Sequence, residues 1–185
     1  TGVQTCALPI SAVVVNTQPS VADVAPQHIT NAPKPALEPE SPQAIWDALS
    51  GFSGRSNSAR YEYVRDTLFP SAGLAVSTQQ VEDNTAWGPE YGEWRGIGNV
   101  LGRRDGSLSE GARKTIVVGG HFDKVTYPWR SATPGQSDGI LDNGSGVTTI
   151  AALAASMTAP RHDILFVAFA SEEPPPFFNG DRKST

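Results

Sequence analysis

Two short apolar runs, TIVVGG (residues 115–120) and DILFVAFA (163–170), are separated by a loop and by one segment with the period of a helix. Unbroken apolar runs of this length, rich in β-branched and aromatic residues, are typical of strands buried inside a sheet. The helix between them ends at Pro160, and one of its faces would carry Val147, Ile150, Ala151, Ala154 and Met157. A strand, a loop, a helix and a second strand in this order form the unit of an α/β sheet, so the predicted fold class is α/β.

The preceding part of the chain predicts two further helices and two further strands. One helix is expected to begin at Ser41, with Pro42 at the first helical position, and to reach Gly51. The segment SNSARYEYVRDTLF (56–69) predicts an amphipathic helix that ends before Pro70. Its apolar face would carry Tyr61, Val64 and Leu68. Strands are expected within GLAVSTQQV (73–81) and RGIGNVLGRRDG (95–106).

The two ends of the chain carry segments that we interpret as read-through from sequencing adapters rather than as natural protein. TGVQTCALPI is what the DNA string ACTGGAGTTCAGACGTGTGCTCTTCCGATC encodes, and DRKST is what GATCGGAAGAGCACA encodes. We therefore expect residues 1–11 and 181–185 to be artefacts. Native codons that continue through Gly180 at the genomic locus would contradict this. Cys6, the only cysteine, would then be no part of the natural protein.

Between these ends the sequence predicts a leader and one domain. Residues 12–42 are rich in Pro, Ala and small polar residues without periodicity, which favours a linker or a disordered leader. Residues 43–180 hold the predicted strands and nearly all of the predicted helices, so we interpret them as the N-terminal part of a domain. The chain has 14 basic and 19 acidic residues, and its net charge of -5 argues against a nucleic-acid surface. No stretch reaches the about 18 to 20 unbroken apolar residues that cross a membrane, and no intact signal peptide is visible.

Polar side chains with metal-binding chemistry stand where the two apolar strands end. His121 and Asp123 follow TIVVGG, and alternation along an extended chain places both on one side. One imidazole nitrogen can then bind a metal while Asp123 accepts a hydrogen bond from the other. Asp142 opens the sequence DNGSG before the helix, and Glu172 and Glu173 follow DILFVAFAS. Each motif alone also fits a structural explanation, namely strand-end polarity, a helix cap and a solvated loop.

The conjunction of the three motifs favours function. The carboxyl ends of neighbouring parallel strands meet at one edge of an α/β sheet, and catalytic groups collect there. A histidine, a lone aspartate and an acid pair come in this order, separated first by a loop and then by one helix and one strand. Adjacent acids in an extended segment point to opposite sides, so that one can bind a metal while the other faces a substrate. The sequence therefore predicts a metal-dependent hydrolase.

The motifs VVGGHFDKV, DNGSGV and AFASEEPPPFF resemble those of the di-zinc aminopeptidases of the bacterial leucyl aminopeptidase and aminopeptidase Y type. The resemblance runs from about Ser41 to Phe178. It implies a three-layer α/β/α, zinc exopeptidase-like fold with a mixed, mostly parallel central sheet that this chain leaves incomplete at its C-terminus. It also implies two Zn ions per complete domain, peptide or N-terminal amino-acid substrates, and a cis peptide bond at Asp142–Asn143. Proline-rich leaders ahead of such a domain are common in exported bacterial hydrolases, which favours a secreted or periplasmic location without establishing one.

The resemblance further implies a role for each site residue. His121 would bind one zinc ion, Asp142 would bridge both ions, and Glu173 would bind the other. Asp123 would orient His121. Glu172 would be the general base that takes a proton from a water activated by the two metals and delivers it to the leaving amine. Since the free α-amine of the substrate docks beside the metals in such enzymes, the implied activity is that of an exopeptidase.

Two ligands that such enzymes need after the acid pair, an aspartate and a distal histidine, cannot be placed in this sequence. After Glu173 the only aspartate is Asp181, in the suspected adapter segment, and no histidine follows. His28 and His162 are no substitutes, and His162 is expected on the surface, at the far end of a strand from the site. The chain would therefore supply only part of the implied ligand set.

Two other functions stay open from the sequence. The aminoacylase and carboxypeptidase group of di-zinc hydrolases also orders H-x-D, Asp and Glu-Glu, although DNGSG and HFDKV favour the aminopeptidase side. A non-catalytic peptidase-like ectodomain would keep the fold without the metals. Members of that kind typically lose the histidine or the base, whereas this chain retains His121 and Glu172.

We predict that these 185 residues alone bind zinc poorly and show no aminopeptidase turnover, because two implied ligands are missing. The measurement is hydrolysis of amino-acid p-nitroanilides by the isolated polypeptide in the presence of zinc. Measurable turnover would contradict the prediction.

Overall fold

The computed structural model describes residues 13–14, 36–80, 95–125 and 138–173, and all structural statements concern these residues. A five-stranded sheet runs through them in the order β1-β4-β5-β3-β2. The strands are β1 (Val13–Val14), β2 (Ala75–Gln79), β3 (Asn99–Arg104), β4 (Thr115–His121) and β5 (Asp163–Phe169). The predicted α/β class with a mixed sheet is confirmed. However, only β4 and β5 pair in parallel, and the other three pairs are antiparallel, so the described sheet is not mostly parallel.

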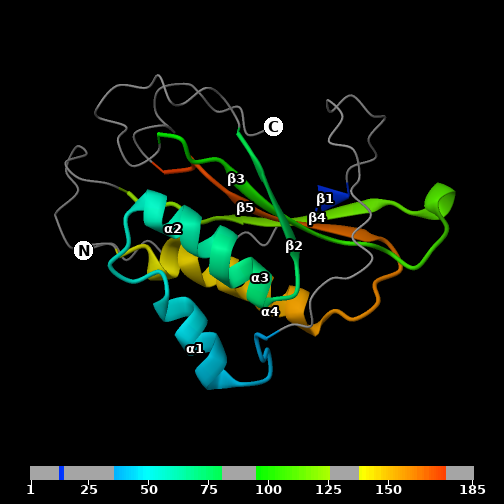
Figure 1. Ribbon diagram of the computed structural model, residues 1–185, viewed down its shortest axis with the longest axis horizontal. Coiled ribbons are helices and arrows are strands. Elements are labelled where there is room, and N and C mark those ends of the chain that lie inside the picture. Colours follow the sequence, from blue (N-terminus) through cyan, green and yellow to red (C-terminus); the bar gives the residue numbers. More distant parts are fainter. Residues whose placement is uncertain (1–12, 15–35, 81–94, 126–137, 174–185) are drawn as a thin grey trace, which may run out of the picture.

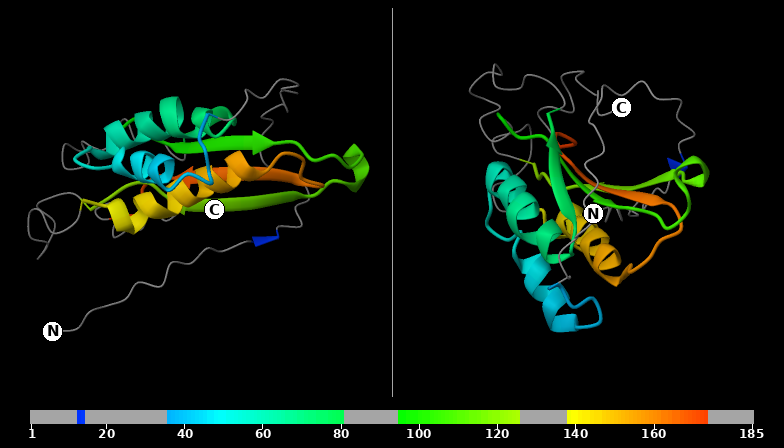
Figure 2. Two further views of the ribbon diagram at one scale, coloured as in Figure 1. Left: turned by 90° about the horizontal axis from the view of Figure 1, so that it is seen from below. Right: turned by 45° about the vertical axis from the view of Figure 1, so that its right-hand side comes forward.

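The described helices gather on one side of this sheet (Figure 1, Figure 2). They are α1 (Pro42–Ser50), α2 (Asn57–Tyr63), α3 (Phe69–Ser71) and α4 (Ser145–Ser156). Two of the three predicted layers, one of helices and the sheet itself, therefore lie within the described residues. None of the described helices combines the length and the apolar character that crossing a bilayer requires.

β5 is apolar on both of its faces. Its residues Ile164, Phe166 and Ala168 belong to the main core under the helices. The alternate residues Leu165, Val167 and Phe169 face away from that core, and Val167 is buried there. The predicted buried strand is thus confirmed for β5. β4 is only half-buried along most of its length, because its one fully paired neighbour is β5 while β1 covers just two of its residues.

The predicted helices form, with one difference at Pro70. α1 begins after Ser41, whose Oγ accepts a hydrogen bond from the backbone of Ala44. α2 continues through a π-helical turn at Val64–Leu68 into α3, so the helix runs past Pro70 to Ser71 instead of ending before it. The wider π-helical turn leaves room for the proline ring, and Pro70 lacks only a backbone donor. Val64 and Leu68 are buried as predicted, whereas Tyr61 is partly buried against the core.

The packed part of the chain begins before residue 43, the predicted start of the domain. The backbone N–H groups of Ala36 and Leu37 both donate to the carbonyl of Ser71, and Leu37 is only 8% exposed. In addition, Val13–Val14 pairs with β4 inside the stretch predicted as a linker or leader. An apolar side chain can be recruited to a core from a proline-rich segment, and composition alone does not reveal which one.

α4 begins directly after the kinked turn Ile140–Gly144, in which Asp142 and Asn143 have non-helical backbone angles. The peptide bond Asp142–Asn143 is cis, as the family resemblance implied. The side-chain carbonyl of Asn143 accepts from the backbone N–H of Gly146 at 3.1 Å. A Cβ atom at Gly146 would collide with the same Asn143 side chain, so the turn requires glycine at this position. Of the predicted apolar face, Val147, Ile150, Ala151 and Ala154 are buried, and Met157 is half-buried at the end of the helix.

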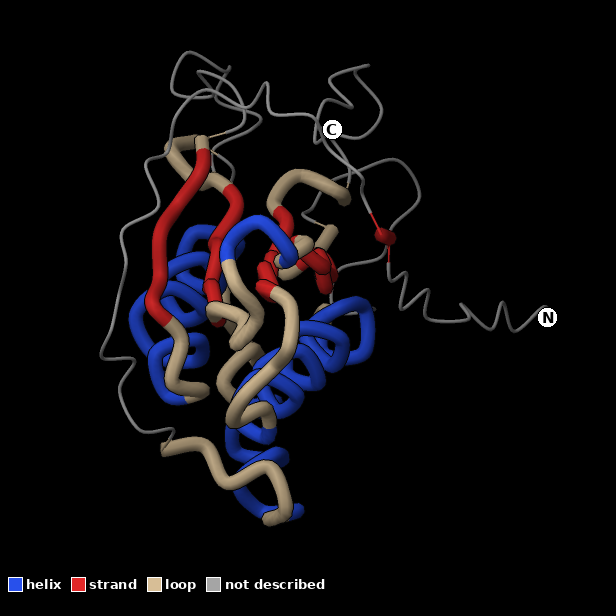
Figure 3. The backbone as a smooth tube through the Cα atoms, turned by 90° about the vertical axis from the view of Figure 1, so that its right-hand side faces the viewer, coloured by secondary structure: helices blue, strands red, loops and turns tan. Residues whose placement is uncertain are grey.

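A cluster of charged groups lies at the amino end of β5. The carboxylate of Asp163 accepts from Arg103 at 2.9 Å, from Arg113 at 3.3 Å and from the backbone N–H of Gly106 at 2.7 Å. It therefore joins β3, the connection to β4 and the start of β5. The 3-10 turn Glu110–Ala112 projects beyond this end of the sheet and lies nearest the viewer in Figure 3.

We predict that Gly146→Ala lowers the free energy of unfolding by about 1–3 kcal/mol, because the new methyl group forces the Asn143 side chain out of its place. This reverses the usual sign, since glycine within a helix is about 1 kcal/mol worse than alanine. Urea unfolding followed by circular dichroism measures the change. Gly111→Ala is the matched control, since a Cβ there meets nothing within 4 Å. Equal stabilities of the two variants would contradict the prediction.

Candidate metal centre

The parallel pairing of β4 with β5 brings the predicted site residues to one edge of the sheet. His121, the last residue of β4, stands opposite Phe169, the last residue of β5. Glu172 and Glu173 follow Phe169 within four positions, after Ser171 turns the chain with a positive φ of 65°. Asp142 lies in the turn that precedes α4, and α4 packs on β4. Three chain segments therefore converge where the parallel strands end.

The candidate ligand atoms lie close together. One ligand atom each of His121, Asp142 and Glu173 fall within 4.8 Å of one another. Nε2 of His121 is 3.1 Å from Oδ1 of Asp142 and 3.7 Å from Oε2 of Glu172. The His121 side chain is only 13% exposed, whereas Asp142 and Glu172 are 57% and 50% exposed. The centre is thus anchored on the protein side and open to solvent on the other.

Asp123 lies beneath this centre and contacts two of its members. Its carboxylate is fully buried, with Oδ1 3.5 Å from Nδ1 of His121. Its Oδ2 accepts a hydrogen bond from the backbone N–H of Glu173 at 2.9 Å. With Nδ1 turned toward Asp123, Nε2 faces Oδ1 of Asp142 and hydrogen-bonds to it at 3.1 Å, so this nitrogen points where a metal-binding histidine would present it.

The pKa values of the site show an excess of carboxylates around one imidazole. Burial disfavours protonation of His121, but Asp123, then Glu172 and Asp142, outweigh it and raise the pKa of His121 to about 9. Burial is the main cause that raises the pKa of Glu173 to about 7; His121 opposes the rise, and the nearby carboxylates add to it. Burial also raises the pKa of Glu172. A divalent cation would relieve this repulsion better than bound protons do.

The donor set fits such a cation. An imidazole nitrogen and carboxylate oxygens are ligands that zinc accepts in catalytic sites, where an open coordination position is retained. His121, Asp142 and Glu173 provide these atoms, and the buried Asp123 supplies the hydrogen-bonding partner behind the histidine. The arrangement can hold a divalent metal beside an accessible carboxylate, Glu172.

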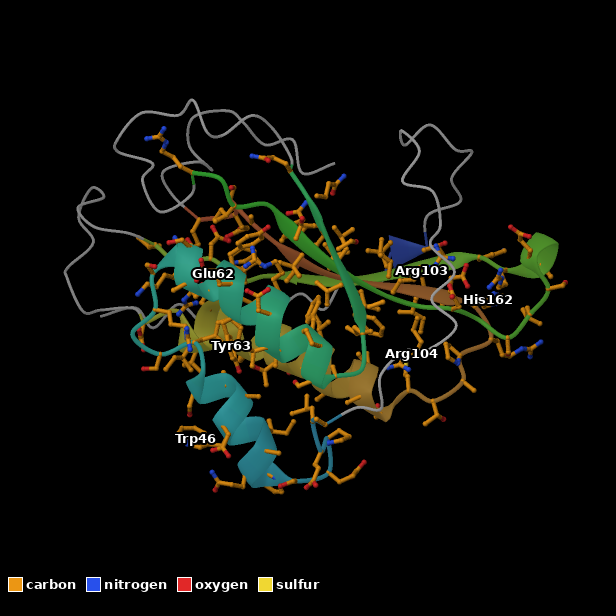
Figure 4. All side chains as sticks on the ribbon, in the orientation of Figure 1. Trp46, Glu62, Tyr63, Arg103, Arg104 and His162 are labelled. Atoms are coloured by element: carbon orange, nitrogen blue, oxygen red, sulfur yellow. The ribbon has the colours of Figure 1, made fainter. Side chains whose placement is uncertain are left out.

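The remaining sequence-predicted residues lie elsewhere. His162 precedes β5 at the opposite end of the sheet (Figure 4), and its Nδ1 accepts from the backbone N–H of Lys114 at 3.3 Å. Its side chain is partly exposed, and it is separated from the site as predicted. His28 and Asp181 lie outside the described residues.

One contributor to the site was missed from the sequence. Asn99, the first residue of β3, is buried, and its Oδ1 accepts from the backbone N–H of Ala170 at 3.0 Å. This bond fixes the chain just before it turns toward Glu172. The sequence GIGNV is typical of an ordinary strand start. A polar amide before an apolar strand was the one local feature that could have indicated a buried hydrogen-bonding role for Asn99.

Parts of this chain are similar to known proteins. Residues 99–179, which include every candidate ligand, match the profile of Peptidase family M28. The uncharacterized protein YfbL of Escherichia coli (strain K12) is 31% identical over 122 residues, which cover 65% of this chain and 33% of that protein. The LapA aminopeptidase of Legionella pneumophila shares 20% identity with a TM-score of 0.42, covering 69% of this chain and 33% of that one.

The chain thus spans about a third of the length of the curated relative that it matches. The matched family is a family of peptidases, which is the broad class of proteins that the motifs resemble. The segment that carries the candidate metal centre is therefore similar to Peptidase family M28.

Proposed function

We propose that this site belongs to a metal-dependent aminopeptidase that hydrolyses the N-terminal peptide bond of peptides. The observation that carries the proposal is the convergence of His121, Asp142 and Glu173, whose ligand atoms lie within 4.8 Å of one another. They converge inside the segment that matches Peptidase family M28, which supports a peptidase rather than another metal-dependent activity.

Each ligand has a place in a two-cation centre. His121 would hold one ion, Glu173 the other, and Asp142 would be shared, since its exposed carboxylate has two oxygens and one of them already lies 3.1 Å from Nε2 of His121. Bound divalent cations would supply Lewis acidity, which lowers the pKa of water and polarises a scissile carbonyl. Asp123 keeps the His121 ring in place and also holds the backbone of Glu173, so that it supports both ends of the centre.

Glu172 is the group we assign as general base. Its carboxylate is half-exposed and lies 3.7 Å from Nε2 of His121, so it borders the centre while it stays accessible to a substrate. Burial raises its pKa, which brings its proton affinity closer to that of a base working near neutral pH. Glu172 would accept a proton from the attacking water and return it to the amine of the departing peptide.

We predict that Glu172→Gln lowers kcat by about 10²- to 10⁴-fold, because the amide cannot accept the proton. The assay uses the natural polypeptide that contains residues 12–180, called the parent protein below, with leucine p-nitroanilide as substrate. Zinc content, measured by atomic absorption, should stay unchanged, because Glu172 is not assigned as a ligand. Glu62→Gln, an exposed acid on α2 (Figure 4), is the control and should retain full activity. A Glu172→Gln variant with wild-type kcat would refute the assignment.

The substrate class is tested with blocked and free N-termini. The parent protein is expected to cleave dipeptides with a free α-amine and to leave their N-acetylated forms intact, as measured by amine release. Preferential hydrolysis of the acetylated forms would instead indicate the aminoacylase-type alternative. Absence of both zinc uptake and hydrolysis would indicate the non-catalytic alternative.

We also predict that removal of metal abolishes activity. Dialysis of the parent protein against dipicolinate should reduce turnover to background, and added zinc should restore it, because the carboxylates and the imidazole alone do not lower the pKa of water. Activity that survives complete metal removal, verified by atomic absorption, would contradict the proposed mechanism.

A further inference from the structure

Two polar side chains of α2, those of Asn57 and Arg60, are fully buried beside the segments that carry the candidate metal centre. Asn57 and Arg60 lie one helical turn apart, so they share a face of α2, and neither is exposed to solvent. Arginine is almost never fully buried unless its donors are satisfied, because desolvation of its charge is unfavourable. The hydrogen bonds of Arg60 therefore show which parts of the structure this residue holds together.

The guanidinium of Arg60 donates to backbone carbonyls of separate chain segments. Its Nη1 donates to the carbonyls of Phe122 and Gly139, each at 3.1 Å. Its Nη2 donates to the carbonyl of Phe52 at 3.2 Å and to that of Asp138. Phe122 is the residue between His121 and Asp123. Asp138 and Gly139 lead directly into the turn that carries Asp142.

Asn57 fixes the same strand end from beside Arg60. Its Nδ2 donates to the carbonyl of Lys124 at 2.9 Å, and its Oδ1 accepts from the N–H of Lys124 at 2.8 Å. The side-chain amide thus pairs with one residue through both hydrogen-bonding groups, as a neighbouring strand would. Lys124 follows Asp123, so Asn57 and Arg60 hold the backbone on both sides of Asp123.

Gly139 shows how closely the guanidinium fits against the Asp142 segment. Its φ is +64°, and a Cβ atom there would lie 2.7 Å and 2.8 Å from the two terminal nitrogens of Arg60. Glycine is therefore needed both for the backbone conformation and for the approach of the arginine. Lysine could not replace Arg60 in this role, because one ammonium group cannot present a planar fork of donors to carbonyls on several segments.

We propose that Arg60 is a positioning residue for the metal centre, which ties the His121–Asp123 segment to the Asp142 segment and so sets the spacing between His121 and Asp142. This inference rests on the proposed function. Arg60 acts through the backbones that carry the ligands, since its guanidinium donates to the carbonyls of Phe122 and Gly139. Loss of Arg60 should separate the two segments and weaken metal binding, with catalysis reduced as a consequence.

Arg104 offers a control for the loss of an arginine that bonds to backbone carbonyls, and it is half-buried. It lies on β3, and its Nη2 donates to the carbonyls of Ala72 and Ala154 at 3.2 Å and 3.0 Å. Both acceptors lie at ends of helices that carry no candidate ligand, α3 and the C-terminal part of α4 (Figure 4). Removal of Arg104 perturbs the packing of the same sheet and helices without touching a segment of the site.

The experiment compares the parent protein with Arg60→Met, Arg60→Lys and Arg104→Met. Zinc affinity is measured by competition with a fluorescent chelator, the geometry of the centre by the absorption spectrum of bound Co²⁺, and stability by urea unfolding of the metal-free proteins. Both Arg60 variants should bind zinc about 10- to 100-fold more weakly, the range seen when groups behind metal ligands are removed, and should show an altered Co²⁺ spectrum. Arg104→Met should lose stability but keep wild-type zinc affinity and the wild-type spectrum.

Wild-type zinc affinity in a folded Arg60 variant would overturn the inference, and so would an equal loss of affinity in Arg104→Met. If Arg60→Met does not fold, Arg60→Lys decides, because it keeps the charge and the aliphatic stem and lacks only the fork. A wild-type parent protein that takes up no zinc would refute the proposed function itself, and this inference with it. Zinc uptake without aminopeptidase activity would refute only the activity.

Discussion

The parallel register between β4 and β5 is the constraint on which the candidate site depends. It places His121 opposite Phe169, so both strands end at the same level and their following residues share one edge of the sheet. A parallel pair needs a crossover connection, and here that connection contains α4. Asp142 directly precedes α4, at the same edge of the sheet as the end of β4. Backbone pairing alone therefore brings ligands from distant parts of the sequence to one edge of the sheet, independently of contacts between their side chains.

Buried polar groups then convert this approximate meeting into a defined geometry. Asp123 contacts the ring of His121 and the backbone of Glu173, while Asn99 holds Ala170 just before the acid pair. Arg60 and Asn57 act on the other side, where the β4 end and the Asp142 turn adjoin. Every one of these groups bonds to the backbone as well as, or instead of, to a ligand side chain. The exposed carboxylates of Asp142 and Glu172 can therefore remain open to solvent without losing their places.

Local sequence patterns predicted the main strands, α4 and the candidate ligands. They did not predict features that depend on contacts between residues far apart in the sequence. The apolar period of α4 and the runs of β4 and β5 predicted the α/β unit, and its strand ends named His121, Asp142 and Glu173, which the structure brings together. The predicted helix end before Pro70 was wrong, because a π-helical turn accommodates this proline within the helix. Leu37 and Arg60 gave no local signal, since their burial depends on partners far along the chain. The metal roles themselves came from the family resemblance and stay predictions.

The polar contacts of Asp163 help to fix the alignment of β5 with the neighbouring strands of the sheet. Asp163 engages Arg103, Arg113 and Gly106 at one end of β5, while Asp123 and Glu173 engage each other beyond its other end. A slip of one residue would exchange the two faces of β5, and since both are apolar, hydrophobic burial alone would penalise it little. The polar contacts at the two ends break this near-degeneracy. Strand alignment, and with it the meeting of the ligands, is thus specified by charge where apolarity is ambiguous.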